Sequence, residues 1–272
     1  MSTATQVIGL RPTSRGRARP GKFVSTIAPP LVVGVIVLLG WELIVRLAEI
    51  PQFILPAPSV IFARFVSDFG IIISASRVTA IAVVGGILLG SVLAVITAFI
   101  VSIFERSSKV VLVIVSVISC APIVALAPIF NAWFGATNLF SKIAIAAIMV
   151  FFPVMVNTTS GLLSVNPLHA ELMQSLGASR WQTLLFVRIP GALPSLVDGL
   201  KVGASLAVIG IIVAEYFGGT ANALGVMIAN SAAISQFALT WAAVFAASAL
   251  GILVYLGVLL LERLIIPWKS SQ

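Results

Sequence analysis

Long apolar runs constrain this chain more than any other feature of its sequence. They cover about residues 31–47, 78–104, 110–130, 143–163, 199–217 and 238–261. A helix needs roughly 20 residues to cross a hydrocarbon core about 30 Å thick. Lipid offers no hydrogen-bond partners, so a backbone that crosses it alone must be helical. The runs therefore predict an all-α, polytopic membrane protein with about six transmembrane helices.

Composition agrees with a membrane location and limits the possible partners. The chain is 60% hydrophobic and only 9% charged, whereas soluble domains are nearer a quarter charged. Its net charge is +8, but the basic residues are scattered and lack an aromatic-rich surface, so nucleic acid is not an expected partner. The single cysteine, Cys120, allows no internal disulfide. Because Cys120 lies in an apolar run, we expect it to be a small buried residue.

The positive charges predict an orientation. With the N-terminus inside, only Arg46, Arg64, Arg77 and Lys142 of the 16 Lys and Arg residues fall in outer segments. The positive-inside rule then places both termini and the loop 165–198 in the cytoplasm. We expect a basic tail over 1–28, a membrane domain over 29–268 that includes this loop, and a short tail over 269–272. A cleaved signal peptide is the competing interpretation of the N-terminus. The first apolar run is too long for one, and no clear cleavage site follows it.

The loop between the fourth and fifth runs predicts two short helices. Pro167 opens the first, which carries Leu168, Leu172 and Leu176 on one face at helical spacing. Gly177 is expected to end it. An apolar face on a short helix outside the membrane needs a partner, and a groove on another protein would serve.

The second loop helix is predicted from its cap and its proline. Ser179 can cap it, and we expect it to stop at Pro190. The alternative for the whole loop is an amphipathic connector between membrane helices.

Glycines recur at four-residue spacing in two of the membrane runs. Gly86 and Gly90 lie in the second run, and Gly199 and Gly203 lie at the start of the fifth. Such spacing lets membrane helices approach closely. Glycine is also simply common in membrane helices, so both interpretations stay open.

The third run contains a broken helix. Pro122 and Pro128 leave backbone carbonyls without their helical donors, and lipid cannot replace these donors. This segment should therefore face the bundle interior or a pore. A kinked structural helix anchored by Trp133 is the alternative. Ser119, Cys120, Pro122, Pro128 and Asn131 are the candidate pathway residues from this run.

Two further polar residues are pathway candidates. Glu215 follows the apolar stretch AVIGIIVA, and a membrane acid is costly unless it is paired, protonated or hydrated. It lies either on the substrate path or just beyond the membrane edge, hydrated by the loop after Gly218. Asn157 either lines a pore or bonds a neighbouring helix. His169, beside the loop helix, is expected at the surface.

The sequence lacks the motifs of common enzymes. It has no GxxxxGK[ST] phosphate loop and no GxSxG nucleophile elbow. One histidine and one cysteine make no metal cluster. We therefore expect no catalytic residue, metal or cofactor on this chain.

The loop also carries a family resemblance. Glu171, Gly177 six residues later and Pro190 thirteen after that resemble the cytoplasmic loop signature of bacterial ABC-importer membrane subunits. Leu172 and Met173 stand where that signature has two alanines. The segment from Pro122 through Pro128 to Trp-Phe-Gly resembles the nitrate/sulfonate/taurine class of these permeases, which includes vitamin-precursor members.

This resemblance implies a type I importer permease of the bacterial inner membrane. Two copies would form the pore, two ATPase subunits carrying ATP and Mg would dock inside, and a solute-binding protein would dock outside. The loop would be a coupling helix that contacts the ATPase. The residues implied in coupling are Glu171, Leu172, Leu176, Gly177, Ala178, Trp181 and Pro190.

The resemblance leaves the substrate open between a small organic anion (nitrate, taurine or another sulfonate) and a vitamin precursor of the pyrimidine or riboflavin type. The stretch 198–219 is somewhat more similar to the vitamin-precursor members. The alternative functions are an ATP-independent secondary transporter or channel, and a scaffold protein. A secondary transporter often shows an internal repeat, and no convincing repeat is present.

Overall fold

The computed structural model describes residues 21–164 and 166–267, and these residues form helices without strands. Five helical stretches are long and apolar enough to cross a membrane, and shorter apolar helices accompany them, which confirms the all-α polytopic prediction. The elements are α1 (Gly21–Leu47), α2 (Pro58–Ser67), α3 (Phe69–Ile103), α4 (Glu105–Ser119), η1 (Ile123–Leu126), α5 (Ala127–Phe134), α6 (Leu139–Leu163), α7 (Pro167–Ser175), α8 (Arg180–Thr183), η2 (Leu184–Arg188), α9 (Ile189–Tyr216), α10 (Leu224–Ala233) and α11 (Phe237–Ile265).

The chain divides into two compact units, residues 1–49 and 50–272. The first unit contains α1, whose stretch Ala28–Leu47 includes the first predicted membrane run. Helix α1 begins at Gly21, within the segment expected to be a tail. Residues 1–20 and 269–272 of the predicted tails lie outside the described residues.

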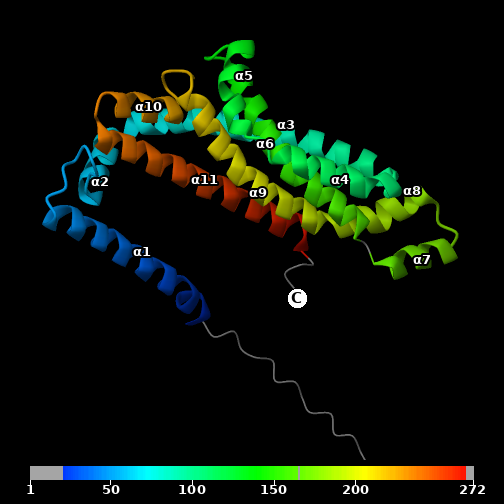
Figure 1. The fold of residues 1–272 in the computed structure, drawn as a ribbon. Coiled ribbons are helices and arrows are strands. Elements are labelled where there is room, and N and C mark those ends of the chain that lie inside the picture. Colours follow the sequence, from blue (N-terminus) through cyan, green and yellow to red (C-terminus); the bar gives the residue numbers. More distant parts are fainter. Residues whose placement is uncertain (1–20, 165, 268–272) are drawn as a thin grey trace, which may run out of the picture. The chain divides into compact units, whose positions relative to one another are not determined.

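Helix α6 forms the centre of the second unit, with α3 and α9 packed against it (Figure 1). A Cβ added at Gly90 would lie 2.4 Å from the carbonyl oxygen of Ala147, and one at Gly86 would lie 2.3 Å from the Cβ of Ala146. From the other side, a Cβ at Gly199 would lie 2.9 Å from the carbonyl oxygen of Pro153. Both glycine pairs therefore serve close helix approach, and both approach the same helix.

The third apolar run is not one helix, so the predicted single span over 110–130 is wrong. Helix α4 ends at Ser119, the 3-10 turn η1 follows Pro122, and α5 begins at Ala127. Pro122 and Pro128 have no N–H to donate, so the helical ladder breaks at the first and restarts at the second. The break itself was predicted from these prolines.

Three basic side chains lie inside the long membrane helices, and two of them, Arg77 and Lys142, were expected outside the apolar runs. Arg77 lies in α3, which begins at Phe69, well before the predicted start of that run. Lys142 lies in α6 and is 4% exposed. Lys201 lies in α9, where its Nζ is 2.7 Å from Glu262 Oε2 and 3.1 Å from Asp198 Oδ1. The two lysines are tolerated inside membrane helices because protein oxygens accept hydrogen bonds or ion pairs from them.

The second loop helix does not stop at Pro190, so that prediction is wrong. α8, the π-helix η2 and α9 follow without a break, and Trp181–Tyr216 is one continuous helical stretch. At the junction the N–H of Ile189 donates to the carbonyl of Leu184, five residues earlier. This wider π turn places Pro190 at the start of α9, where a residue without an N–H is tolerated.

We predict that Gly90→Val destabilises the protein, because the valine cannot fit against the backbone of Ala147. Overpacking of this kind costs roughly 1–3 kcal/mol, so the melting temperature of the detergent-purified chain should fall by several degrees. The matched control is Gly257→Val in α11, where an added Cβ meets nothing within 4 Å. Equal melting temperatures for the two variants would contradict this account of the α3–α6 contact.

Candidate functional site

The first helix of the connecting loop, α7, is capped at both ends by residues that flank it. The Asn166 side chain accepts a hydrogen bond from the N–H of Leu168 at 3.0 Å, and Pro167 occupies the first turn. At the other end, the N–H of Ala178 donates to the carbonyl of Met173 at 2.9 Å. Gly177 has φ +73°, the left-handed conformation that this kind of cap requires. The prediction that Gly177 ends this helix is confirmed.

The start of α8 shows the predicted cap at Ser179. Its Oγ accepts from the N–H of Gln182 at 3.3 Å, and the Gln182 side chain accepts from the N–H of Ser179 at 2.8 Å. This reciprocal pair is a capping box. It fixes the angle at which the chain leaves the Gly177 turn and enters the long helical stretch to Tyr216.

Large apolar side chains of this loop, which we call the elbow (Pro167–Thr183), are exposed in the described part of the chain. The side chains predicted to grip a partner are 58–72% exposed: Leu168, Leu172, Leu176 and Trp181. Glu171 and His169 are exposed beside them, and Ala178 is half-buried. A set of large apolar side chains so exposed marks an interaction surface. Figure 1 shows α7 and α8 at one end of the second unit, opposite α10.

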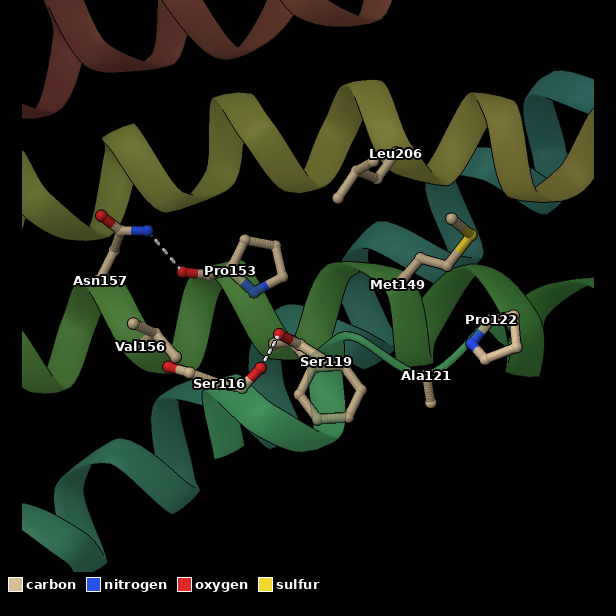
Figure 2. Close-up of a pocket in the computed structure, with 10 residues that line it drawn as sticks. Ser116, Ser119, Ala121, Pro122, Met149, Pro153, Val156, Asn157 and Leu206 are labelled. Atoms are coloured by element: carbon tan, nitrogen blue, oxygen red, sulfur yellow. Dashed lines mark hydrogen bonds between the residues drawn. The ribbon is translucent and has the colours of Figure 1, made fainter. Parts of the chain in front are cut away.

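A cavity of about 440 Å³ lies where the broken α4 segment meets α6 and α9 (Figure 2). The end of α4 and the turn after it form one wall, the middle of α6 forms another, and α9 contributes Leu206. Its lining residues are Ser116, Ser119, Ala121, Pro122, Met149, Phe152, Pro153, Val156, Asn157 and Leu206.

Polar atoms in this cavity are held by backbone contacts. Asn157 Nδ2 donates to the carbonyl of Pro153 at 2.8 Å, and Ser119 Oγ donates to the carbonyl of Ser116 at 2.7 Å. Figure 2 shows the Asn157 Oδ1 turned away from the Pro153 carbonyl. The Asn157 amide therefore bonds within its own helix, so the predicted bond to a neighbouring helix is not what holds it.

The candidate pathway residues separate into three groups. Ser119, Pro122 and Asn157 line the cavity. Cys120 and Pro128 are exposed and do not line it, so the expectation that Cys120 is buried is wrong. The α4 helix ends at Ser119, and the break leaves the thiol at an open turn. Asn131 and Glu215 are buried in polar clusters elsewhere.

Glu215 connects three helices. It is 2% exposed, and the Thr79 hydroxyl of α3 lies 3.0 Å from both its carboxylate oxygens. The N–H of Gly225 donates to Oε2 at 2.9 Å, and the N–H of Leu224 donates to Thr79 Oγ1 at 3.0 Å. These bonds attach the first turn of α10 to α9 and α3. Of the two alternatives for Glu215, hydration by the loop after Gly218 is wrong because protein groups surround the carboxylate, and Glu215 does not line the cavity either.

Asn131 organises the second polar cluster. Its Oδ1 accepts from Ser141 Oγ at 2.7 Å and from Lys142 Nζ at 2.6 Å, and its Nδ2 donates to the carbonyl of Ala214 at 3.3 Å. Asn131 thus joins α5 to α6 and α9. The alternative role for this segment, with Trp133 at an interface, fits the 71% exposure of the Trp133 side chain.

Sequence reasoning missed several of the residues that build these sites. Pro153 and Asn157, four apart in α6, were a detectable signal for the cavity, but only Asn157 was selected. Thr79 and Glu215 are 136 residues apart, and no local pattern connects them. Lys142 was counted as a loop charge because it lies near the start of its apolar run.

Comparison with known proteins finds similarity to membrane components of transport systems. A family model described as binding-protein-dependent transport system inner membrane component matches residues 86–270. The formylaminopyrimidine transport permease protein of Halalkalibacterium halodurans is 31% identical over 89% of this chain and 96% of its own length. The riboflavin transport system permease protein of Chloroflexus aurantiacus is 30% identical over 87% of this chain and 88% of its own. A putative aliphatic sulfonates transport permease protein of Bacillus subtilis is 27% identical over 94% and 91%.

We predict that Thr79→Val loosens α10, because it removes the hydroxyl that bonds Glu215 and leaves the N–H of Leu224 without its acceptor. An unsatisfied buried group costs about 1–3 kcal/mol, so the melting temperature should fall by several degrees. Hydrogen exchange at the start of α10 should also accelerate. Thr97→Val is the matched control, since Thr97 lies on the same helix and bonds only its own backbone at Leu93. If both valines leave α10 equally protected, the Thr79 hydroxyl does not hold this helix.

Proposed function

This chain belongs to the family of binding-protein-dependent transport system inner membrane components, and from that membership we propose that it works as a homodimer driven by separate ATPase subunits. It is the permease subunit of an ABC importer, a multi-pass membrane protein and not an enzyme. The two copies would line the translocation pathway between them. ATP and Mg would be bound by the partner ATPase and not by this chain.

The elbow is the observation that carries this proposal. Its apolar face is exposed, its two helices are capped, and the Gly177 turn between them is fixed by backbone hydrogen bonds. A groove on an ATPase subunit would bury Leu172, Leu176 and Trp181. Glu171 would supply a polar contact at the edge of that groove. The short helix in a hydrophobic groove is a recurring mode of recognition between proteins.

The continuous stretch from Trp181 to Tyr216 suggests how movement reaches the pore. A displacement of the elbow enters α9 directly, with no flexible loop between them. Because α9 packs along α6 and holds α10 through Glu215, it would move these elements with it. ATP binding would favour the state in which the ATPase pair is closed, and the elbow would pass that preference to the permease.

The remaining partners follow from the family description and the relatives. A binding protein would deliver the solute on the outer side of the bacterial inner membrane, and both termini would lie in the cytoplasm. The named relatives serve formylaminopyrimidine, riboflavin and aliphatic sulfonates. The substrate of this chain is accordingly a small organic anion or a vitamin precursor.

We predict that Gly177→Leu abolishes co-purification of the ATPase subunit, because leucine is strained at φ +73° and the elbow turn would open. Gly177→Asn should retain the ATPase, since asparagine tolerates the left-handed conformation. Gly70→Leu is the control, at an ordinary helical glycine with nothing within 4 Å of an added Cβ. Glu171→Ala should weaken capture without changing the melting temperature. ATPase recovery with Gly177→Leu, or uptake by the purified chain without any ATPase, would contradict the proposal.

The orientation predicts which thiols can be labelled from outside the cell. In a Cys120→Ser background, the Ser175→Cys variant in the elbow should react with a membrane-impermeant maleimide only after the cells are permeabilised. The Ala221→Cys variant, in the loop before α10, should react in intact cells, and both sites are exposed. Labelling of the Ser175→Cys variant in intact cells would place the elbow outside, where no ATPase can reach it.

A further inference from the structure

We infer that the cavity between α4, α6 and α9 binds the transported solute and suits an uncharged planar ring with hydrogen-bonding groups better than a small anion. This inference rests on the proposed transport function and decides between its two substrate classes. Four features of the cavity carry it: the position, the charge, the placement of polar atoms and the apolar walls (Figure 2).

The cavity lies where two helices deviate from regular backbone. Pro153 is inside α6, near the middle of its span, and α4 ends beside it at Ser119. Pro153 has no N–H to donate to the carbonyl of Met149, one turn earlier. Irregular backbone at membrane depth is tolerated where it lines a cavity, and transporters place solute sites at such broken helices.

No charged side chain is among the ten residues that line the cavity. The buried Lys142 in α6 donates to Asn131 and to the carbonyl of Ala136 instead. Lys201 in α9 is paired with Glu262 and Asp198. The cavity is open on its α4 side, where Ser116, Ser119, Ala121 and Pro122 are exposed, so a sulfonate or nitrate that enters it would lose part of its hydration without gaining a cation. Burying a charge without a partner is far more costly than burying a neutral polar group that finds a hydrogen bond.

The polar atoms of the cavity offer both donors and acceptors. Asn157 Nδ2 donates one N–H to the Pro153 carbonyl and keeps its second N–H as a donor on the cavity side, whereas Figure 2 shows Oδ1 on the far side of the amide from the other labelled lining residues. In the described part of the chain, the Ser116 hydroxyl bonds to no other protein group, so it can donate or accept. The Ser119 hydroxyl already donates to the Ser116 carbonyl and can still accept. An amino group and a ring nitrogen on one heterocycle would match an acceptor and a donor placed in this way.

The rest of the lining is apolar and suits the faces of a flat ring. Met149, Phe152, Val156 and Leu206 contribute aliphatic, thioether and aromatic surface, and Pro122 adds a rigid edge. A volume of about 440 Å³ lies in the range of sites that hold small organic ligands. An inorganic anion would fill only a small part of this space.

The only cysteine of the chain provides a direct test. Cys120 is exposed and lies between Ser119 and Ala121, which both line the cavity. A solute in the cavity should slow the reaction of this thiol with a methanethiosulfonate reagent. The full-length chain in lipid nanodiscs is labelled with and without 4-amino-5-hydroxymethyl-2-methylpyrimidine, in mildly alkaline buffer that keeps the ring uncharged. Ethanesulfonate is the anionic probe. We expect protection by the pyrimidine and none by ethanesulfonate.

Variants connect the protection to the cavity. Asn157→Leu should weaken the pyrimidine's protection about tenfold in concentration, the effect of one lost hydrogen bond at this half-buried side chain. Ser116→Ala should weaken it in the same direction, whereas Ser248→Ala, a matched serine on α11 that bonds its own backbone, should not. Ala121→Arg adds a cation to the lining and should transfer protection from the pyrimidine to ethanesulfonate. This gain of function cannot arise from a misfolded chain.

Three results would overturn the inference: no protection by the pyrimidine, equal protection by ethanesulfonate, or protection unchanged by Asn157→Leu. The first would mean that the cavity holds lipid or remains empty. None of these results depends on an ATPase, so they are separate from a failure of the proposed function. That failure would appear as a chain that captures no ATPase, whatever happens to Cys120.

Discussion

The structure depends on how closely α6 can approach its two neighbours. In lipid, apolar side chains gain little by leaving their surroundings for one another, so helices are held by van der Waals contact and by hydrogen bonds. Gly86 and Gly90 on α3, and Gly199 and Gly203 on α9, bring backbone against α6 from both sides. This contact sets the distance between α3 and α9. It therefore also sets the geometry of the Glu215 bonds, which span those two helices.

The polar clusters around Glu215 and Asn131 add hydrogen bonds between helices to the close contacts at the glycines. A carboxylate and an ammonium inside a membrane domain are tolerated only where protein groups replace their hydration. Glu215 receives two donors, from Thr79 and Gly225, while Lys142 donates to Asn131 and a backbone carbonyl. The two clusters fix α10 and α5 to the helices beneath them. Because the polar groups of both clusters have hydrogen-bond partners within the protein, the clusters favour a structural role. None of their charged residues lines the cavity.

Much of this fold could be predicted from local sequence patterns. The features that could not be predicted depend on contacts between residues that are distant in sequence. Run length predicted the long membrane helices apart from the broken third run. Gly177 predicted the elbow turn and Pro122 predicted the break after α4, because each depends on residues near in sequence. The continuation through Pro190 was missed, since a π turn is specified by packing and hydrogen bonds that have no sequence signature here. The Thr79 bond to Glu215 was missed because its partners meet only after folding.

The positions of the elbow and the cavity favour a mechanism in which α9 links them. The elbow joins α9 at its start, the cavity contacts α9 at Leu206, and Glu215 lies one residue before its end. The helical stretch is continuous from the elbow to Glu215, with the π turn and Pro194 as its points of bending, so a tilt at the elbow would change the cavity wall and the Glu215 bonds together. The opposite wall belongs to α4. The helix breaks between α4 and α5, so α4 is not held to α5 by continuous helical hydrogen bonds. Relative movement of these two walls would open and close the cavity without breaking the glycine contacts that hold α6.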